Sequence, residues 1–247
     1  MAEEFRPTLG GTPMNGWFVT ATDTNVGKTF VASALIRWLN QQGLTTAGYK
    51  PAASGALVDA DGCQSWEDVE ALYRASGEKW PRELICPQTF ELPLAPPFAA
   101  RRAGKIIDES RLIQGAQNWT GQVSHLIVEG AGGWLSPISN NWSNADLAAQ
   151  LKFPVLLVAR LGLGTINHTL LTLESIERRG LPILGIVLSE STHLPEDIST
   201  SDNPTELAQR TPHPILAVIP HQTGQPGEIP PPLRSPVWLD LAREPQL

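Results

Sequence analysis

The strand, loop and helix of residues 17–39 constrain this chain more than any other part of its sequence. A stretch of strand character runs into a loop that ends in Gly27-Lys28-Thr29, and the apolar helical pattern of residues 30–39 follows directly. Backbone N–H groups of such a loop form a cradle for phosphate oxygens, while the lysine reaches the β- and γ-phosphates and the threonine ligates Mg²⁺. The segment therefore predicts a nucleoside triphosphate site. Taken alone, the Gly-Lys-Thr triplet would also suit an ordinary helix start.

The loop departs from the usual spacing of phosphate-binding loops. The first glycine of a strict Walker A motif would fall on Thr22, and only a loop one residue longer, starting at Ala21, restores the pattern. This departure is typical of a subset of nucleotide enzymes. We expect residues 25–29 to surround the phosphates.

Strand and helix patterns alternate along the rest of the chain. This alternation predicts an α/β fold of the P-loop NTPase type, a mostly parallel sheet with helices on both faces. Further strands are expected at 45–50, 124–129, 154–160, 183–188 and 214–220, and further helices at 66–74, 108–118, 144–151, 167–179 and 204–210. The Pro-rich stretch 80–97 fits no regular element. We expect a single domain over residues 1–247, with an N-terminal extension at 1–15 and a Pro-rich C-terminal arm at 223–247.

Composition narrows the possible partners. The net charge is −7, and the 18 basic residues form no cluster beyond two Arg-Arg pairs, so we expect no nucleic-acid partner. Cys63 and Cys86 are too few for a disulfide framework. No apolar run approaches the length that crosses a bilayer. We therefore expect a cytoplasmic protein that does not bind membranes.

Charged residues follow two other predicted strands. Lys50 ends the strand at 45–50, with Ser54 close behind it, and Glu129 ends the strand at 124–129 and precedes a glycine-rich turn. Ligands of parallel sheets bind at the carboxyl ends of the strands, so these side chains should face the phosphate loop. Two lysines and a Mg²⁺ held by Thr29 and Glu129 would neutralise a phosphoryl group in transfer.

Four motifs together resemble dethiobiotin synthetase, in the order and spacing of that family. They are the loop 22–29, Tyr49-Lys-Pro-Ala-Ala-Ser-Gly55, Val128-Glu-Gly-Ala-Gly-Gly-Trp134 and residues 164–172, and the resemblance covers roughly residues 16–220. It implies a homodimeric cyclo-ligase of biotin synthesis that uses ATP as co-substrate with Mg²⁺. In this reaction CO₂ adds to one amine of 7,8-diaminononanoate, ATP phosphorylates the carbamate, and the second amine closes the ring.

The resemblance also implies roles for individual residues. Lys50 and Lys28 are the expected catalytic lysines. Thr29, Asp68 and Glu129 are the expected metal ligands, although Asp59, Asp61 and Glu67 compete with Asp68 for its place. The expected substrate contacts are Thr24, Ser54 and, from the partner subunit, the helix start Gly164, Thr165, Ile166 and Asn167. The expected nucleotide contacts are Asn25, Val26, Gly27, Lys28, Thr29, Asp68, Glu129, Gly130, Ala131, Gly132, Ser189, Pro220, His221 and Gln222.

The base site departs from the family, and two other classes share this fold. Ser189-Glu190 stands where many members have an Asn-Asp type pair that reads adenine, so the sequence predicts weak selection of the base. A partition or site-determining ATPase would need a signature lysine where this chain has Asp23. A glutamine-dependent amidation enzyme would need an additional domain for which the chain has no room. A nucleotide sensor without enzymatic activity is a further alternative.

Overall fold

The computed structural model describes residues 14–192, 197–221 and 227–244 and is built around one parallel sheet. The strand order is β10-β9-β8-β1-β7-β2, and all five pairings are parallel. These strands are β1 (Asn15–Ala21), β2 (Thr46–Tyr49), β7 (His125–Glu129), β8 (Val155–Arg160), β9 (Ile183–Ser189) and β10 (Ile215–Ile219). The predicted fold class is confirmed. The inner strands are apolar because helices cover both of their faces.

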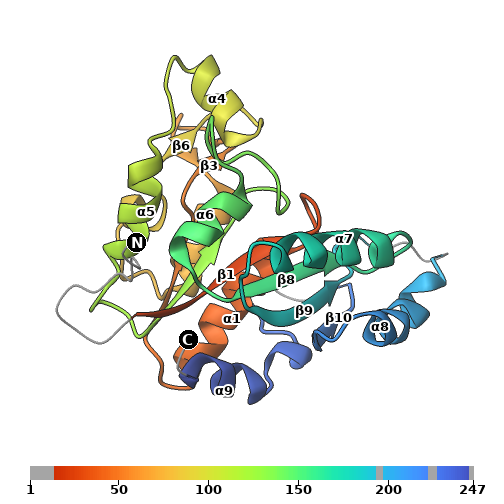
Figure 1. Ribbon diagram of the computed structural model, residues 1–247. Coiled ribbons are helices and arrows are strands. Elements are labelled where there is room, and N and C mark those ends of the chain that lie inside the picture. Colours follow the sequence, from red (N-terminus) through yellow and green to blue (C-terminus); the bar gives the residue numbers. More distant parts are fainter. Residues whose placement is uncertain (1–13, 193–196, 222–226, 245–247) are drawn as a thin grey trace, which may run out of the picture.

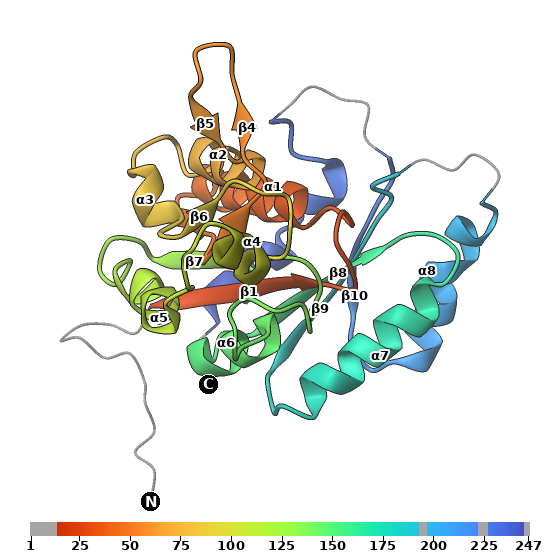
Figure 2. The ribbon, with the colours of Figure 1, turned by 90° about the horizontal axis from the view of Figure 1, so that it is seen from above.

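Helices lie on both faces of the sheet (Figures 1 and 2). α6 and α7 cover one face of the sheet. α1 covers the other face, and α9 packs against α1 on that side. The helices are α1 (Lys28–Gln41), α2 (Glu67–Ala75), α3 (Arg82–Ile85), α4 (Pro96–Arg102), α5 (Glu109–Gln117), α6 (Asn144–Leu151), α7 (Thr165–Glu177), α8 (Ser199–Arg210), the 3₁₀ turn η1 (Pro231–Leu233) and α9 (Val237–Arg243).

The strand order fixes where the predicted site residues meet. β1 lies between β8 and β7, and β2 lies beside β7, so the phosphate loop, Glu129 and Lys50 follow three consecutive strands of the sheet. The Pro-rich stretch 80–97 contains α3, the short strand β6 (Thr89–Phe90) and the start of α4. β6 pairs with β3 (Ala53–Ser54), and β4 (Leu57–Val58) pairs with β5 (Gln64–Ser65) in a projecting hairpin.

α8 begins five residues before its predicted start. Proline is favoured at the first position of a helix, so the sequence pattern pointed to Pro204, which instead lies inside the helix. The helix begins at Ser199 because the Asp197 carboxylate accepts a hydrogen bond from the Ser199 backbone N–H at 3.0 Å. Asn203 then ties the first turn to the Gly162 carbonyl at 2.9 Å.

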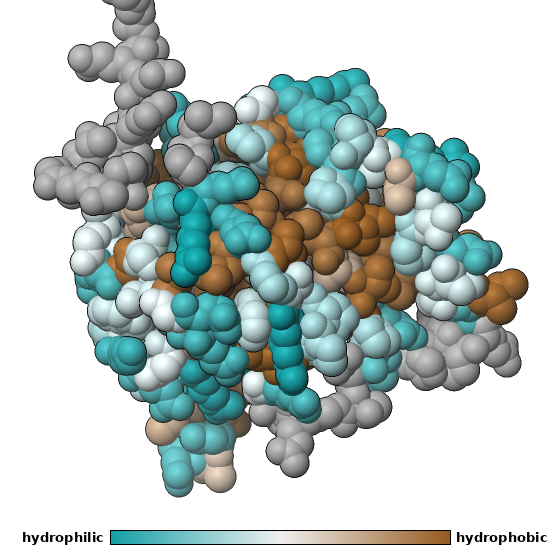
Figure 3. Space-filling view, turned by 90° about the horizontal axis from the view of Figure 1, so that it is seen from below, coloured by the Kyte–Doolittle hydropathy of each residue, from teal (hydrophilic) through white to brown (hydrophobic). Residues whose placement is uncertain are grey.

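The face that carries α1 and α9 gathers hydrophobic side chains at its centre, with hydrophilic ones around them (Figure 3). α9 and η1 lie in the range expected as a Pro-rich arm, and Trp238 of α9 is fully buried there beside Trp17 of β1. Among the described residues, no helix has the length and apolar character needed to cross a membrane.

His125 is a buried imidazole at the start of β7. It is 1% exposed, packs edge-on against Trp17 with 4.5 Å between ring centroids, and neither of its nitrogens has a hydrogen-bond partner among the described residues. Burial lowers its pKa to about 3, so the folded protein holds this ring neutral.

We expect His125 to make the protein sensitive to acid. Below pH 6.5 the unfolded chain protonates this imidazole while the folded chain does not until about pH 3, so stability falls with pH in that window by up to about 1.4 kcal/mol per unit. In His125→Leu the loss of unfolding free energy between pH 6.5 and 4.5 should be about 2–3 kcal/mol smaller than in wild type. Urea titrations measure this difference, with the exposed His168→Leu as control. Equal losses in both variants would show that His125 does not contribute.

Candidate functional site

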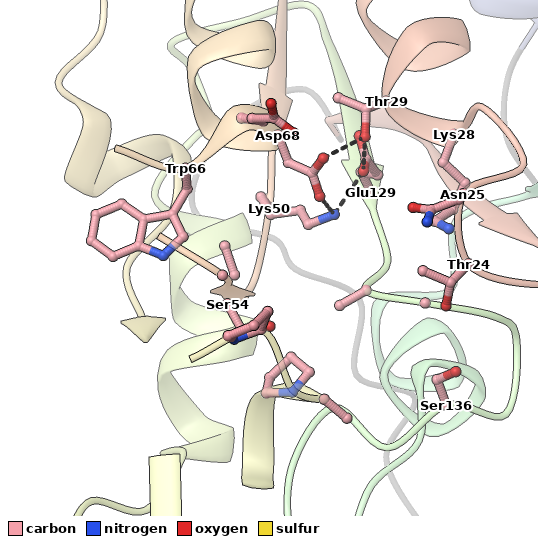
Figure 4. Close-up of a pocket in the computed structure, with 18 of the residues that line it drawn as sticks. Thr24, Asn25, Lys28, Thr29, Lys50, Ser54, Trp66, Asp68, Glu129 and Ser136 are labelled. Carbon is pink, nitrogen blue, oxygen red and sulfur yellow. Dashed lines mark hydrogen bonds and ion pairs between the residues drawn. The ribbon is translucent and has the colours of Figure 1, made fainter. Parts of the chain in front are cut away.

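A cavity of about 810 Å³ opens at the carboxyl ends of β1, β7 and β2. The phosphate loop borders it on one side, and Lys50, Asp68 and Glu129 lie at its centre (Figure 4). Of the predicted residues, the cavity brings together Thr24, Asn25, Gly27, Lys28, Thr29, Lys50, Ser54, Asp68, Glu129, Ala131 and Gly132.

The phosphate loop is shaped by two residues in the left-handed region. Asn25 has φ 58° and Gly27 has φ 97°, and asparagine and glycine are the residues that tolerate this conformation best. A Cβ on residue 27 would also lie 2.7 Å from the Ser189 hydroxyl oxygen, so a side chain there would force the serine to move. The loop leads into α1, whose first turn contains no acidic residue. The positive end of the helix dipole is therefore open to an anion.

Lys50 is buried between two carboxylates. Its Nζ lies 2.6 Å from Glu129 Oε1 and 2.5 Å from Asp68 Oδ2, and it donates to the Gly130 carbonyl at 3.2 Å. Burial disfavours the ammonium form, but the two carboxylates outweigh burial and raise the pKa of Lys50. The ammonium is therefore fixed in a site that is 2% exposed.

Thr29 connects the loop to the same carboxylates. Its hydroxyl lies 2.8 Å from Asp68 Oδ1 and 2.7 Å from Glu129 Oε1, although its single proton can serve only one of them at a time. Glu129 Oε2 is buried and has no hydrogen-bond partner among the described residues. The Thr29 hydroxyl and the two carboxylates thus bring oxygen ligands together, and one of the carboxylate oxygens lacks a partner. Such a set suits a hard divalent cation.

Asp68 is the acidic group that meets Thr29. Glu67 also lines the cavity, whereas Asp59 and Asp61 lie exposed in the loop of the β4–β5 hairpin. The described residues hold no cluster of three or more His, Cys, Asp and Glu side chains placed for a metal. A cation here would take its remaining ligands from water and phosphate, as Mg²⁺ usually does.

The electrostatics of the centre favour added positive charge. Burial and the neighbouring Asp68 carboxylate raise the pKa of Glu129. Burial also opposes ionisation of Asp68, but the Lys50 charge and the hydrogen bonds from Lys50 and Thr29 leave its pKa below the ordinary value. Burial and the Lys50 charge together lower the pKa of Lys28 to about 8. A bound triphosphate would oppose this shift, because its charge favours the ammonium form.

The side of the cavity opposite the loop is mainly apolar. We call it the far wall, formed by Ala53, Ser54, Gly55, Trp66, Pro93, Leu94, Ala95 and Pro96. The Ser54 hydroxyl donates to the Leu94 carbonyl at 2.6 Å, and the Trp66 indole N–H donates to the Phe90 carbonyl at 2.9 Å. The first bond links two residues of the far wall, and the second links the wall to Phe90 of β6. The Ser54 oxygen can still accept a hydrogen bond.

A second pocket of about 200 Å³ adjoins the phosphate loop at Gly27. Its lining includes the predicted Ser189, Pro220 and His221, together with Phe30, Glu190, Ser191 and Ile219. The backbone N–H of His221 donates to the Glu190 carboxylate at 2.9 Å, and the Ser191 hydroxyl donates to the Asn25 carbonyl at 2.8 Å. The predicted Gln222 lies outside the described residues.

Other predicted residues do not line the cavity. Val26 is buried, and Gly130 contributes its carbonyl to Lys50. The helix start of residues 164–167 is absent from the lining of both pockets. Sequence reasoning missed Trp66, residues 93–96, Phe30, Ser136 and Ser191. Phe30 directly follows the Gly-Lys-Thr triplet, and Ser191 lies two residues after the end of β9, so sequence position was a signal for both residues. No such signal pointed to the far wall.

Solved structures share this fold at low sequence identity. A ParA family ATPase from Chlorobium tepidum superposes with a TM-score of 0.52 at 15% identity, covering 92% of this chain and 98% of that one. The septum site-determining protein MinD from Pyrococcus horikoshii, in complex with Mg-ADP, gives 0.51 at 16%, covering 85% and 82%. These likenesses establish a P-loop NTPase fold and nothing finer.

Sequence comparisons are more specific. Residues 15–225 match the family described as AAA domain. The ATP-dependent dethiobiotin synthetase BioD of Anaeromyxobacter dehalogenans is 48% identical over 84% of this chain and 90% of its own length. The protein of the same name from Yersinia pestis is 37% identical over 83% and 84%. The chain therefore belongs to the dethiobiotin synthetase family, as its four motifs predicted.

Proposed function

We propose that this chain catalyses the ATP-dependent formation of dethiobiotin from 7,8-diaminononanoate and CO₂. One amine takes up CO₂ as a carbamate, the γ-phosphoryl group moves to the carbamate to give a carbamic-phosphoric anhydride, and the second amine closes the ureido ring with loss of phosphate. The observation that carries this proposal is the buried Lys50 ammonium, held by Glu129 and Asp68 in the cavity that the phosphate loop borders. Family membership supports the choice of reaction.

The two lysines would neutralise negative charge on different parts of the substrates. A carbamate anion must approach a γ-phosphate that is itself anionic, so positive charge between them lowers the barrier. Lys28, in the loop, contacts the phosphates already in the ground state. Lys50, at the centre of the cavity, faces the carbamate and the transferring group (Figure 4).

Thr29, Asp68 and Glu129 would hold Mg²⁺. The unpartnered Glu129 Oε2 and the convergence of carboxylate and hydroxyl oxygens on Thr29 fit such a cation. When bound, Mg²⁺ supplies charge neutralisation on the triphosphate oxygens. Of this chain's own groups, Glu129 and Asp68 also hold Lys50 in place, so the same carboxylates orient the catalytic ammonium.

Thr24 and Ser54 face each other across the cavity and would bind the diamine end of the substrate. Ser54 has already donated its proton to Leu94, so its oxygen is free to accept a hydrogen bond from an amine. CO₂ and nucleoside triphosphate complete the set of substrates. We place the reaction in the cytoplasm, with no role for nucleic acid or membrane.

The carboxylate end of the substrate would bind at the α7 start of a second subunit. Residues 164–167 do not line the cavity of their own chain, and Gly164, at φ 90°, precedes a helix without acidic residues in its first turn. Leu163 beside it is 79% exposed, and Leu135, one residue from the cavity residue Ser136, is 60% exposed. Exposed apolar side chains on both segments support a homodimer in which each site uses two chains.

Mixed dimers test this arrangement. Lys50→Ala and Asn167→Asp should each be inactive, the second because its charge repels the substrate carboxylate. After subunit exchange, random pairing should restore about a quarter of wild-type activity, since half of the dimers would hold one intact site of two. Exchange is verified with two tags of different mass. No recovery after verified exchange would place the whole site within one chain.

We expect weak discrimination between nucleoside triphosphates. Phosphate contacts are common to all of them, and Ser189 cannot make the paired donor and acceptor contacts with which an asparagine amide reads adenine. Phe30 instead offers a ring face that any base can stack on. Values of kcat/KM for ATP, CTP and GTP should lie within roughly tenfold, about 1.4 kcal/mol. Steady-state assays decide this, and a hundredfold preference for ATP would show that other groups read the base edge.

The proposed function itself is tested by substrate requirement. Phosphate release from ATP should depend on both bicarbonate and 7,8-diaminononanoate, and dethiobiotin should form in step with it. A nucleotide sensor would bind ATP and show neither dependence. Mass spectrometry of the product with ¹³C-bicarbonate identifies the ureido carbon, and unlabelled or absent product would refute the proposal.

A further inference from the structure

Trp66 stands out among the cavity residues that the reaction has not used. It is the residue before α2, two positions ahead of Asp68, and its partly buried ring packs against the hydrophobic core while it lines the cavity. In Figure 4 the ring lies on the side of the cavity opposite the loop residues Thr24, Asn25 and Lys28, and Lys50 lies between the two sides. The ring therefore lines the same cavity as the lysine that we propose faces the transferring group.

The far wall has few side-chain groups that can donate a hydrogen bond to water in the cavity. Its two polar side-chain hydrogens, on the Trp66 indole and the Ser54 hydroxyl, are donated to the carbonyls of Phe90 and Leu94. Pro93 and Pro96 have no backbone N–H at all. What faces the cavity from this side is mainly carbon. The Trp66 N–H bond to Phe90 also ties the ring to β6, which pairs with β3 and so with Ser54.

The proposed reaction needs such a wall. A carbamic-phosphoric anhydride can react with the second amine, or with water to return carbamate and inorganic phosphate. The second route consumes ATP and water to give ADP and phosphate, and the carbamate then loses CO₂ to regenerate the diamine. The fraction of each route depends on how well water is kept from the anhydride beside Lys50.

We propose that Trp66 is a positioning residue that keeps water from the anhydride and so couples ATP cleavage to ring closure. The inference rests on the proposed function. In this role the ring determines how much dethiobiotin forms for each ATP that is cleaved. The nucleotide itself is bound by the loop on the opposite side of the cavity.

The test is the ratio of phosphate released to dethiobiotin formed. In wild type this ratio should be about one, and in Trp66→Ala it should rise about fivefold or more, because water fills the space that the ring vacates. Trp66→Phe keeps an apolar ring without the N–H bond and should stay within about twofold of wild type. Trp80→Ala is the matched control, since Trp80 is a partly buried tryptophan outside the cavity that packs on Trp119 at 5.2 Å. Its ratio should not change.

The outcomes separate the possible roles of the ring. A Trp66→Ala protein with a raised KM for the diamine and an unchanged ratio would show that the ring binds the substrate chain, and the inference would be wrong. A lower rate with an unchanged ratio, or an equal rise in Trp80→Ala, would show a structural effect and would also overturn it. A wild-type chain that forms no dethiobiotin would refute the proposed function as well, whereas normal wild-type yield with an unchanged Trp66→Ala ratio refutes only the role of the ring.

Discussion

Lys50→Ala should lower kcat by a factor of about 10²–10³ while nucleotide binding stays largely intact. The ammonium is fixed by Glu129 and Asp68 at the centre of the cavity and, among the described residues, makes no hydrogen bond to the phosphate loop, so its loss should remove positive charge from the transferring group and leave the loop in place. Steady-state rates and titration with a fluorescent nucleotide analogue give the two quantities. Retention of more than about a tenth of wild-type kcat would remove Lys50 from the mechanism.

Lys28→Ala is the informative comparison. It should weaken triphosphate affinity as well as rate, because we propose that Lys28 contacts phosphates that are present before the reaction begins. Lys50→Ala should also lower the stability of the protein, so the experiment needs a control for stability. It leaves two carboxylates facing each other, one of them fully buried, and an unpaired buried charge is destabilising. Lys50→Arg keeps the charge, so a folded but inactive Lys50→Arg would separate catalysis from stability.

Trp238→Ala should lower the free energy of unfolding by about 3–5 kcal/mol, the range for removing a fully buried large aromatic side chain. Trp238 is 0% exposed and lies 6.1 Å from Trp17 between ring centroids, so its removal leaves a cavity against the central strand β1. Urea titration followed by circular dichroism measures the loss. The exposed Asp240→Ala on the same helix should change stability by less than about 0.5 kcal/mol.

This result bears on the extent of the domain. α9 lies beyond residues 15–225, the part of the chain that matches the AAA domain family. A large loss in Trp238→Ala would support one folding unit that includes the C-terminal arm. A loss below about 1 kcal/mol would indicate that the arm contributes little to the stability of the sheet.

The sequence predicted the sheet better than the connections between its strands. Each central strand is a short apolar run followed by a polar or glycine-rich turn, and this pattern depends only on neighbouring residues. The secondary structure of residues 80–97 was harder to predict. α3 and β6 have only four and two residues, and their placement depends on contacts with distant segments. Local pattern gives no sign of a two-residue strand that pairs with residues 53–54.

The same distinction holds for the site. Lys50 and Glu129 could be predicted because each ends a predicted strand, and parallel strands bring such positions to one edge. Lys28 could be predicted because it belongs to the Gly-Lys-Thr triplet of the phosphate loop. Trp66 and residues 93–96 come from two connections that are far apart in the chain, and only the folded structure brings them together as the far wall. Their residue types, tryptophan, proline, leucine and alanine, are also those of an ordinary core.

The close approach of Ser189 to Gly27 limits how this chain could evolve. The serine is 4% exposed, and its hydroxyl occupies the space where a Cβ on Gly27 would lie. A side chain on residue 27 would have to push the Ser189 side chain aside and would also have to adopt φ 97°, a conformation that residues with a Cβ rarely take. Glycine at 27 and serine at 189 therefore depend on each other, and we expect the effects of substitutions at these two positions to be coupled.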